Sequence, residues 1–243
     1  MKRLPIYILV DTSGSMEGEK IEKVKSGLEG MKRVLSTTIE TQDSTFVSLI
    51  LFNSSAEIAV KLTPIRGFQI PNLTAGGMTS YADALSTLVA CYNTDVVKRT
   101  ASNQGSADYK PILLMFSDGA PTDSSSTLRA AIEDFQTNHA RKFGACVCFY
   151  AHSSSDSESE IAKTRSCLEQ ICGKSQNGDR VSGATLGTLI DVSDDYNKIK
   201  EFFKAFSQSI VSSQKASKDP AQGLNADLKQ ELGDDIQGGM VFS

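Results

Sequence analysis

The chain has 243 residues, of which 40% are hydrophobic and 22% charged, so it is long enough and apolar enough to form one sizeable folded domain. Its formal net charge of −4 argues against a strongly electrostatic nucleic-acid binder. We therefore expect no nucleic-acid partner. No stretch approaches the roughly 20 apolar residues that span a bilayer, so we expect no membrane insertion either.

The first apolar run, residues 6–10, has no polar alternation, which is typical of a strand that is covered on both faces. It leads directly into the loop Asp11-Thr12-Ser13-Gly14-Ser15. A secretory signal would end in a small-residue cleavage site instead of such a loop. We therefore interpret this run as the first strand and expect a cytoplasmic protein.

Further apolar runs alternate along the chain with segments of helical periodicity. This alternation predicts an α/β fold, a doubly wound and mainly parallel sheet with helices on both faces. A short turn at Asn53-Ser54-Ser55 joins two of the runs and predicts a hairpin with one antiparallel edge strand. The further strands are expected at residues 46–52, 56–62, 111–116, 145–150 and 188–192.

Five apolar stripes at helical spacing mark the expected helices, and the first and last of them begin at Ile21 and Ile199. Thr122 or Asp123 is expected to cap the helix that carries Leu128, and Asp194 or Asp195 is expected to start the last helix. The periodicity fades after about Ser213. We therefore expect one domain over residues 1–213 and a flexible C-terminal tail, or a docking peptide, over residues 214–243.

The five cysteines are an odd number in a chain of this size, which does not fit a disulfide framework. Two of them, Cys146 and Cys148, fall in an expected strand, and we expect their side chains on opposite faces. A zinc site would require these and the pair Cys167 and Cys172 to converge. We expect free thiols instead.

Three polar loops are expected at one edge of the sheet, where the carboxyl ends of its strands meet and ligands bind in such folds. The first is Asp11-Thr12-Ser13-Gly14-Ser15 after the first strand. The second, Gly76-Gly77-Met78-Thr79-Ser80, precedes a helix, and the third, Ser117-Asp118-Gly119, follows a strand. Their hydroxyl and carboxylate oxygens are hard ligands that suit Mg²⁺, Ca²⁺ or Mn²⁺.

This set of loops resembles the von Willebrand factor A-type domain and its metal-ion-dependent adhesion site. That family has an Asp-x-Ser-x-Ser loop, a distant Thr and a distant Asp, and the resemblance covers roughly residues 5–212. Within the family, the segments LPIYILVDTSGSM, FSDGAPTD and EFFKAFSQSI are similar to the bacterial TerY-like group linked to tellurite resistance. The matching metal-site positions are Asp11, Ser13, Ser15, Thr79 and Asp118.

We expect Ser13, Ser15 and Thr79 to contact the metal directly, while Asp11 and Asp118 orient waters or hydroxyls around it. One coordination position then stays open for an Asp or Glu of a partner protein. The resemblance implies a cytoplasmic bacterial stress-response system with kinase-like or phosphatase partners. We therefore predict a metal-dependent protein-interaction module.

Catalysis is disfavoured by the scarcity of bases, because the chain has only two histidines, His139 and His152. His139 is expected in solvent at the end of a helix. His152 follows the fifth expected strand and could be a site residue or a plain loop residue. We expect no enzyme, and the alternatives are a metal-dependent phosphohydrolase that uses the same loops or a scaffold whose site holds no metal.

Overall fold

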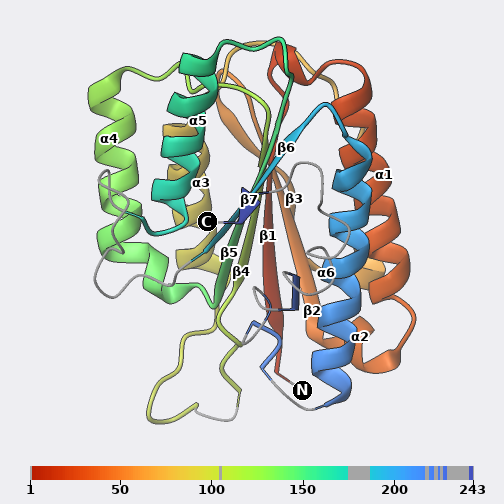
Figure 1. Ribbon diagram of the computed structural model, residues 1–243. Coiled ribbons are helices and arrows are strands. Elements are labelled where there is room, and N and C mark those ends of the chain that lie inside the picture. Colours follow the sequence, from red (N-terminus) through yellow and green to blue (C-terminus); the bar gives the residue numbers. More distant parts are fainter. Residues whose placement is uncertain are drawn as a thin grey trace.

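The computed structural model describes residues 2–103, 106–174, 187–216, 219–221, 224 and 227–228, and the backbone of residues 241–242. Within this part of the chain, seven strands form one sheet in the order β3-β2-β1-β4-β5-β6-β7. Figure 1 shows this sheet between two layers of helices. The strands are β1 (Leu4–Asp11), β2 (Thr45–Phe52), β3 (Ala56–Pro64), β4 (Ile112–Ser117), β5 (Ala145–His152), β6 (Thr188–Ser193) and β7 (Val241–Phe242).

The sheet is mainly parallel, as predicted. β2, β1, β4, β5 and β6 pair in parallel, and β3 returns antiparallel to β2 through the turn at residues 53–55. The predicted fold class and its antiparallel edge strand are therefore confirmed. A second antiparallel partner, the two-residue β7, pairs with β6. The sequence did not predict β7, because two residues carry no periodicity.

Helices cover both faces of the sheet (Figure 1). On one face lie α1 (Glu19–Leu35), α2 (Ile39–Ser44) and α6 (Asn197–Lys215); on the other lie α3 (Tyr81–Asp95), α4 (Ser125–Asp134) and α5 (Glu158–Ile171). Short helical turns span Gly14–Met16, Ile65–Gly67, Phe135–His139 and Ala140–Lys142. None of the described helices is both long and apolar enough to cross a membrane.

Every residue of β1 is buried, because the strand packs against helices on both sides. Ile6, Ile8 and Val10 face the first core, under α1 and α6, whereas Tyr7 and Leu9 face the second core, under α3, α4 and α5. This explains why the run at residues 6–10 lacks polar alternation. It also places Asp11 at the buried end of a central strand.

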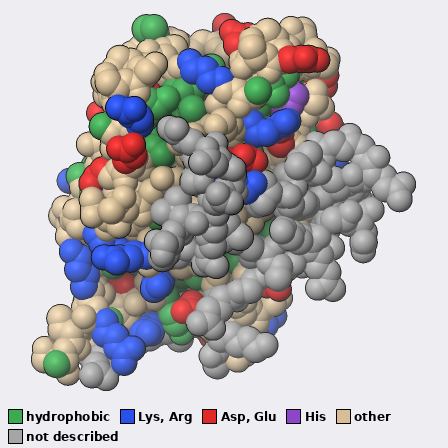
Figure 2. All heavy atoms as spheres, turned by 60° about the vertical axis from the view of Figure 1, so that its left-hand side comes forward, with side chains coloured by type: hydrophobic (Ala, Val, Ile, Leu, Met, Phe, Trp, Pro, Cys, Tyr) green, Lys and Arg blue, Asp and Glu red, His purple; other side chains and the backbone are tan. Residues whose placement is uncertain are grey.

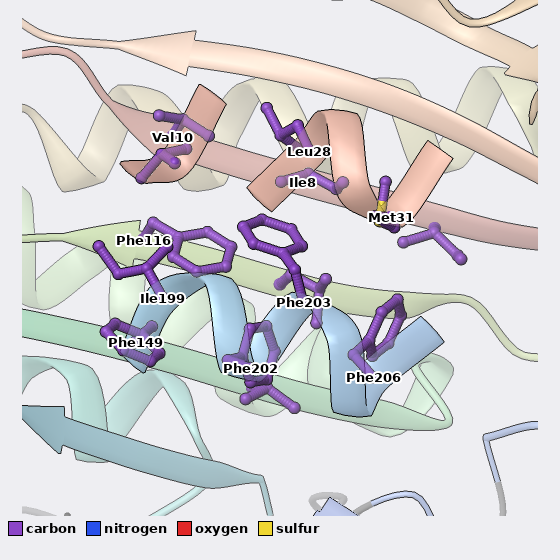
Figure 3. Close-up of a cluster of buried hydrophobic side chains, with 14 of the residues drawn as sticks. Ile8, Val10, Leu28, Met31, Phe116, Phe149, Ile199, Phe202, Phe203 and Phe206 are labelled. Atoms are coloured by element: carbon purple, nitrogen blue, oxygen red, sulfur yellow. The ribbon is translucent and has the colours of Figure 1, made fainter. Parts of the chain in front are cut away.

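Aromatic rings fill the first core between the sheet and α6 (Figure 3). The ring of Phe203 stacks on that of Phe116 with centroids 4.8 Å apart. Gly27 of α1 lies directly above Phe203, and a Cβ atom at Gly27 would come 2.2 Å from the ring. Glycine is therefore required here for α1 and α6 to pack closely, a role that the helical stripe alone did not reveal.

The expectation for Cys146 and Cys148 is wrong. Residues two apart on a strand point to the same face, and both side chains lie in the second core. Cys172, which follows α5, lies there as well. All five cysteines are buried free thiols, as expected.

The helix caps differ from the prediction in two places. Ser124, rather than Thr122 or Asp123, caps α4, and its Oγ accepts a hydrogen bond from the Thr127 N–H. Asp123 instead accepts the N–H of Tyr81 at the start of α3 (2.8 Å). α6 begins after Tyr196, and Asp194 takes up a left-handed conformation (φ 61°). The sequence could not show these assignments, because a polar residue before a helix can bond to a neighbouring helix equally well.

Parts of the segment expected as a tail pack onto the domain. α6 continues to Lys215, and Ala221, Leu224 and Leu228 are buried in the first core. The Ser209 hydroxyl donates to Asp227 (2.7 Å). Most of residues 214–243 lie outside the described residues, so the domain boundary at 213 and the flexible tail stay predictions.

Candidate metal centre

The first and second predicted loops lie against each other at the carboxyl edge of the sheet. The Gly14 N–H donates to the Gly77 carbonyl (3.1 Å), and the Gly76 N–H donates to the Thr12 carbonyl (2.8 Å). Gly77 adopts φ +85°, and a Cβ atom there would come 2.8 Å from Ser54 Oγ. Glycine at this position lets the second loop pack closely against the turn at residues 53–55.

Asp11 is fully buried where β1 ends. Its Oδ1 accepts a hydrogen bond from the Ser13 N–H (2.8 Å), and its Oδ2 accepts one from the Ser117 hydroxyl (2.6 Å). Burial raises the pKa of Asp11 from 3.8 to about 6, although the hydrogen bonds from Ser117 and Ser13 oppose this rise. The carboxylate is thus held in place, and its charge is costly unless a cation lies nearby.

The side chains of the three loops meet beside Asp11. Ser13 Oγ lies 3.1 Å from Ser15 Oγ, and the Ser15 hydroxyl donates to Asp118 Oδ1 (2.7 Å). A Cβ atom at Gly119 would come 3.3 Å from Ser15 Oγ and 4.0 Å from Thr79 Oγ1. The structure therefore brings together all five predicted site residues, and Gly119 leaves room between two of their hydroxyls.

Thr79 is held by Thr122, a residue after the third loop that the sequence assigned to a possible helix cap. Its N–H donates to Thr122 Oγ1 (3.1 Å), and its carbonyl accepts the Thr122 N–H (2.8 Å). With Asp123 bonded to the start of α3, the segment after Asp118 is tied to the loop that carries Thr79. These contacts fix the position of the Thr79 hydroxyl relative to Asp118.

The sequence analysis missed Lys20 as a member of this site. The Lys20 ammonium lies 2.6 Å from Asp118 Oδ2, and both side chains are largely buried. It also lies over the Tyr196 ring, 5.4 Å from the ring centroid. A lysine in the first turn of a helix carries no signal of its own, because such residues are usually solvated. Its pairing with Asp118 depends on packing α1 beside the end of β4.

The site opens into a cleft of about 480 Å³. Ser13, Ser15, Thr79 and Asp118 form part of its wall. The cleft extends toward α5, where Asp156 and Glu160 line it, and the exposed Met78 lies at its rim. The cleft therefore combines hydroxyl and carboxylate oxygens with a small apolar rim.

The opposite end of the sheet has the opposite charge. Figure 2 shows Lys and Arg side chains gathered over the lower part of the visible face. A second cleft of about 440 Å³ at the amino ends of the central strands is lined by Lys2, Lys98, Arg99, Lys110 and Lys142, among others. Although the net charge is −4, the charged side chains are unevenly distributed over the protein. The carboxylates of the metal loops do not line this second cleft.

Neither histidine lines the cleft of the metal loops. His152 Nε2 lies 3.1 Å from the buried carboxylate of Asp191, which also accepts a hydrogen bond from Arg165 Nε (2.6 Å). His139 lies 3.4 Å from Asp134. Each histidine therefore lies beside a carboxylate, and neither lines the cleft that the metal loops form.

The donor set fits a hard divalent cation. It offers hydroxyls of Ser13, Ser15 and Thr79 together with two carboxylates, and hard cations take oxygen ligands of these kinds. The site also attracts positive charge in the structure itself, because the Lys20 ammonium lies against Asp118. That these residues bind a metal ion stays a prediction.

The family follows from a sequence comparison. The profile of the von Willebrand factor type A domain matches residues 6–179, which include all three metal loops. The chain belongs to this family. VWA domains bind a divalent metal ion at their metal-ion-dependent adhesion site and are typically interaction modules without catalysis. No curated protein sequence matches the chain.

Solved structures share the fold of this VWA domain. The pilus adhesin SpaC from Lactobacillus rhamnosus GG aligns with a TM-score of 0.60 at 17% identity, over 87% of this chain and 31% of the adhesin. A D319A mutant of the PilB minor pilin from Streptococcus sanguinis aligns with a TM-score of 0.59 at 14% identity, over 89% of this chain and 64% of the pilin. Proximal thread matrix protein 1 from the mussel byssus aligns with a TM-score of 0.52 at 13% identity, over 84% of this chain and 46% of the matrix protein. The chain thus spans less than two thirds of each of these proteins.

Proposed function

We propose that this VWA domain is a non-enzymatic interaction module that binds an acidic side chain of a partner protein through a divalent metal ion, with Mg²⁺ as the first candidate. The observation that carries the proposal is the convergence of three hydroxyls and the Asp118 carboxylate at one open cleft, with the Asp11 carboxylate buried next to Ser13. The absence of both histidines from the walls of that cleft favours binding over catalysis.

Each residue has a distinct part in this proposal. Ser13, Ser15 and Thr79 offer neutral oxygens, while Asp11 and Asp118 supply charge and orient hydroxyls or waters. The bound ion would supply an electrophilic position that a carboxylate from outside can occupy. Since Asp11 is held by the Ser13 N–H and the Ser117 hydroxyl, its carboxylate needs no rearrangement when the partner binds.

We place the module in the cytoplasm of a bacterial cell, in a stress response of the tellurite-resistance type. Its similarity to the TerY-like group supports this setting, together with kinase-like or phosphatase proteins as partners. The experiment that tests this setting identifies the partner directly.

The test is co-purification of partners from the native cell with Mg²⁺ and with EDTA. We expect a specific partner in Mg²⁺ that is lost in EDTA and lost with Thr79→Val, which removes one hydroxyl while keeping the shape of the side chain. Thr94→Val is a matched control, because the Thr94 hydroxyl is exposed on α3 and bonds only the carbonyl of Ala90. Equal recovery in Mg²⁺ and EDTA would refute metal-bridged binding.

The competing assignment is a phosphohydrolase that uses the same loops. A generic phosphate ester incubated with Mg²⁺ and the purified chain separates the two functions. We expect no turnover above that of the Asp11→Asn variant. Turnover that depends on Asp11 would replace the interaction module with an enzyme.

A further inference from the structure

Three cysteines that belong to none of the metal loops meet in the second core. Cys146 and Cys148 project from β5, and Cys172 follows the end of α5. Their three sulfur atoms lie within 4.8 Å of one another. All three side chains are buried, with at most 4% exposed. Three soft ligand atoms are thus gathered at one point inside the protein.

The local structure explains how these sulfurs come together. Cys146 and Cys148 are two apart on one strand and so point to the same face. The chain after α5 passes close to β6, because Gly187 lets it do so: a Cβ atom at Gly187 would come 2.7 Å from the Cys146 carbonyl and 3.0 Å from Cys172 Cα. The Gly187 N–H also donates to the Cys172 carbonyl (2.7 Å). A larger residue at position 187 would push Cys172 away from the other two.

The thiols have acceptors of their own. Cys172 Sγ lies 3.4 Å from the Thr188 carbonyl, and Cys146 Sγ lies 3.8 Å from the Ile171 carbonyl. These weak contacts satisfy two S–H groups when no ion is present. Because these hydrogen bonds are weak, little free energy is lost when a bond from sulfur to a metal ion replaces them.

The number of ligands selects among soft metals. Thiolates favour Cu(I), Zn²⁺ and iron–sulfur clusters. Structural zinc sites and most iron–sulfur clusters need four protein ligands. Among the described residues, the group holds three cysteines and no fourth His, Cys, Asp or Glu. Cu(I) accepts three sulfur ligands without a fourth, so it matches this set better than zinc or iron does.

We propose that Cys146, Cys148 and Cys172 form a three-coordinate, all-sulfur site for Cu(I). Each cysteine that binds as thiolate gives up its S–H proton to solvent, so at most three protons leave as one Cu(I) enters, with no change of oxidation state. This site is separate from the oxygen-based centre at Asp11, because the two use different residues.

The test is anaerobic titration of the reduced, full chain with Cu(I) in competition with a chromophoric Cu(I) chelator. We expect the wild-type protein to hold one Cu(I), and Cys172→Ser and Cys148→Ser to bind it more than about 100-fold less tightly, because even outer-shell changes typically cost 10- to 100-fold. The matched controls are Cys91→Ser and Cys167→Ser, which change two other buried thiols of the same core. Both should bind Cu(I) like the wild type, and so should Asp11→Asn.

X-ray absorption of the wild-type copper complex makes the result independent of how well the variants fold. Three sulfur neighbours around copper are expected. Fewer sulfurs, equal copper binding by Cys172→Ser and Cys167→Ser, or no retention against the chelator would each overturn the proposal. Tight Zn²⁺ binding in place of Cu(I) would overturn the three-coordinate assignment, because it would require a fourth ligand.

Discussion

The Lys20 ammonium lies 2.6 Å from Asp118 Oδ2, inside the cleft where the three polar loops meet. Asp118 is one of the five predicted metal-site residues, so a cation of the protein itself already compensates part of the charge that would attract a metal ion. The pair joins α1 to the end of β4. Lys20 therefore connects metal affinity to the position of α1.

Replacing Lys20 with Gln should strengthen metal binding. A charge of +1 and a charge of +2 about 5 Å apart repel each other by about 1.7 kcal/mol even in bulk water. We therefore expect the Mg²⁺ affinity of Lys20→Gln to rise roughly tenfold, measured by calorimetric titration at fixed salt. Lys23→Gln is the matched control, because Lys23 is on the same helix and pairs with Glu19 instead. Unchanged or weaker binding by Lys20→Gln would contradict this role.

Metal binding should weaken in mildly acidic solution. Burial raises the pKa of Asp11 to about 6, and the protonated carboxyl no longer attracts a cation. Between pH 8 and pH 7 the Mg²⁺ affinity should be nearly constant, and below about pH 6 it should fall by up to tenfold per pH unit. Titrations across this range check the prediction, and a constant affinity down to about pH 5 would exclude Asp11 from the site.

Asp11→Asn should separate metal binding from folding. Since the pKa of Asp11 lies above its ordinary value of 3.8 in the folded state, the contribution of Asp11 to stability is largest below about pH 4 and is lost as the pH rises through about 6. The ionised carboxylate then costs the metal-free protein up to about 3 kcal/mol. In EDTA at neutral pH, Asp11→Asn should therefore unfold no more easily than the wild type.

Thermal unfolding in EDTA and in saturating Mg²⁺ measures both effects of this change. Mg²⁺ should raise the midpoint for the wild type and not for Asp11→Asn, because only a bound ligand stabilises the folded state. Asp43→Asn, which removes one charge from a surface pair with Arg66, should respond to Mg²⁺ like the wild type. An equal Mg²⁺ response in Asp11→Asn would remove Asp11 from the centre.

Two glycines of α1 should respond in opposite ways to alanine. At Gly27 a methyl group would meet the ring of Phe203, which is fully buried and stacked on Phe116. Overpacking of this kind costs about 1–3 kcal/mol. At Gly30 a Cβ atom would meet no atom within 4 Å, so alanine should stabilise the helix by about 0.5–1 kcal/mol. Chemical denaturation of both variants tests the pair, and a stabilised Gly27→Ala would contradict the packing of α1 on α6.

The fold could be predicted well, because every strand except β7 and most of the described helices leave a local pattern. The expected strand at residues 46–52 and the observed Thr45–Phe52 differ by one residue, and the turn at residues 53–55 forms the predicted hairpin. The six-residue α2 was missed, because it is too short for a full stripe of apolar residues. The caps at Ser124 and Asp123 were misassigned, because the partner of a polar residue near a helix end is decided by which element packs beside it.

The amino-acid sequence by itself determined the buried strand that ends in Asp11 and the order of the three polar loops, and hence the family. It could do so because the burial of a strand and the chemistry of a loop depend on residues that are close together in the chain. Only the tertiary structure decided that Lys20 pairs with Asp118 and that Cys172 joins Cys146 and Cys148. Such contacts join residues far apart in the chain. They depend on how helices dock against the sheet, and the spacing of residues along the chain does not predict that docking.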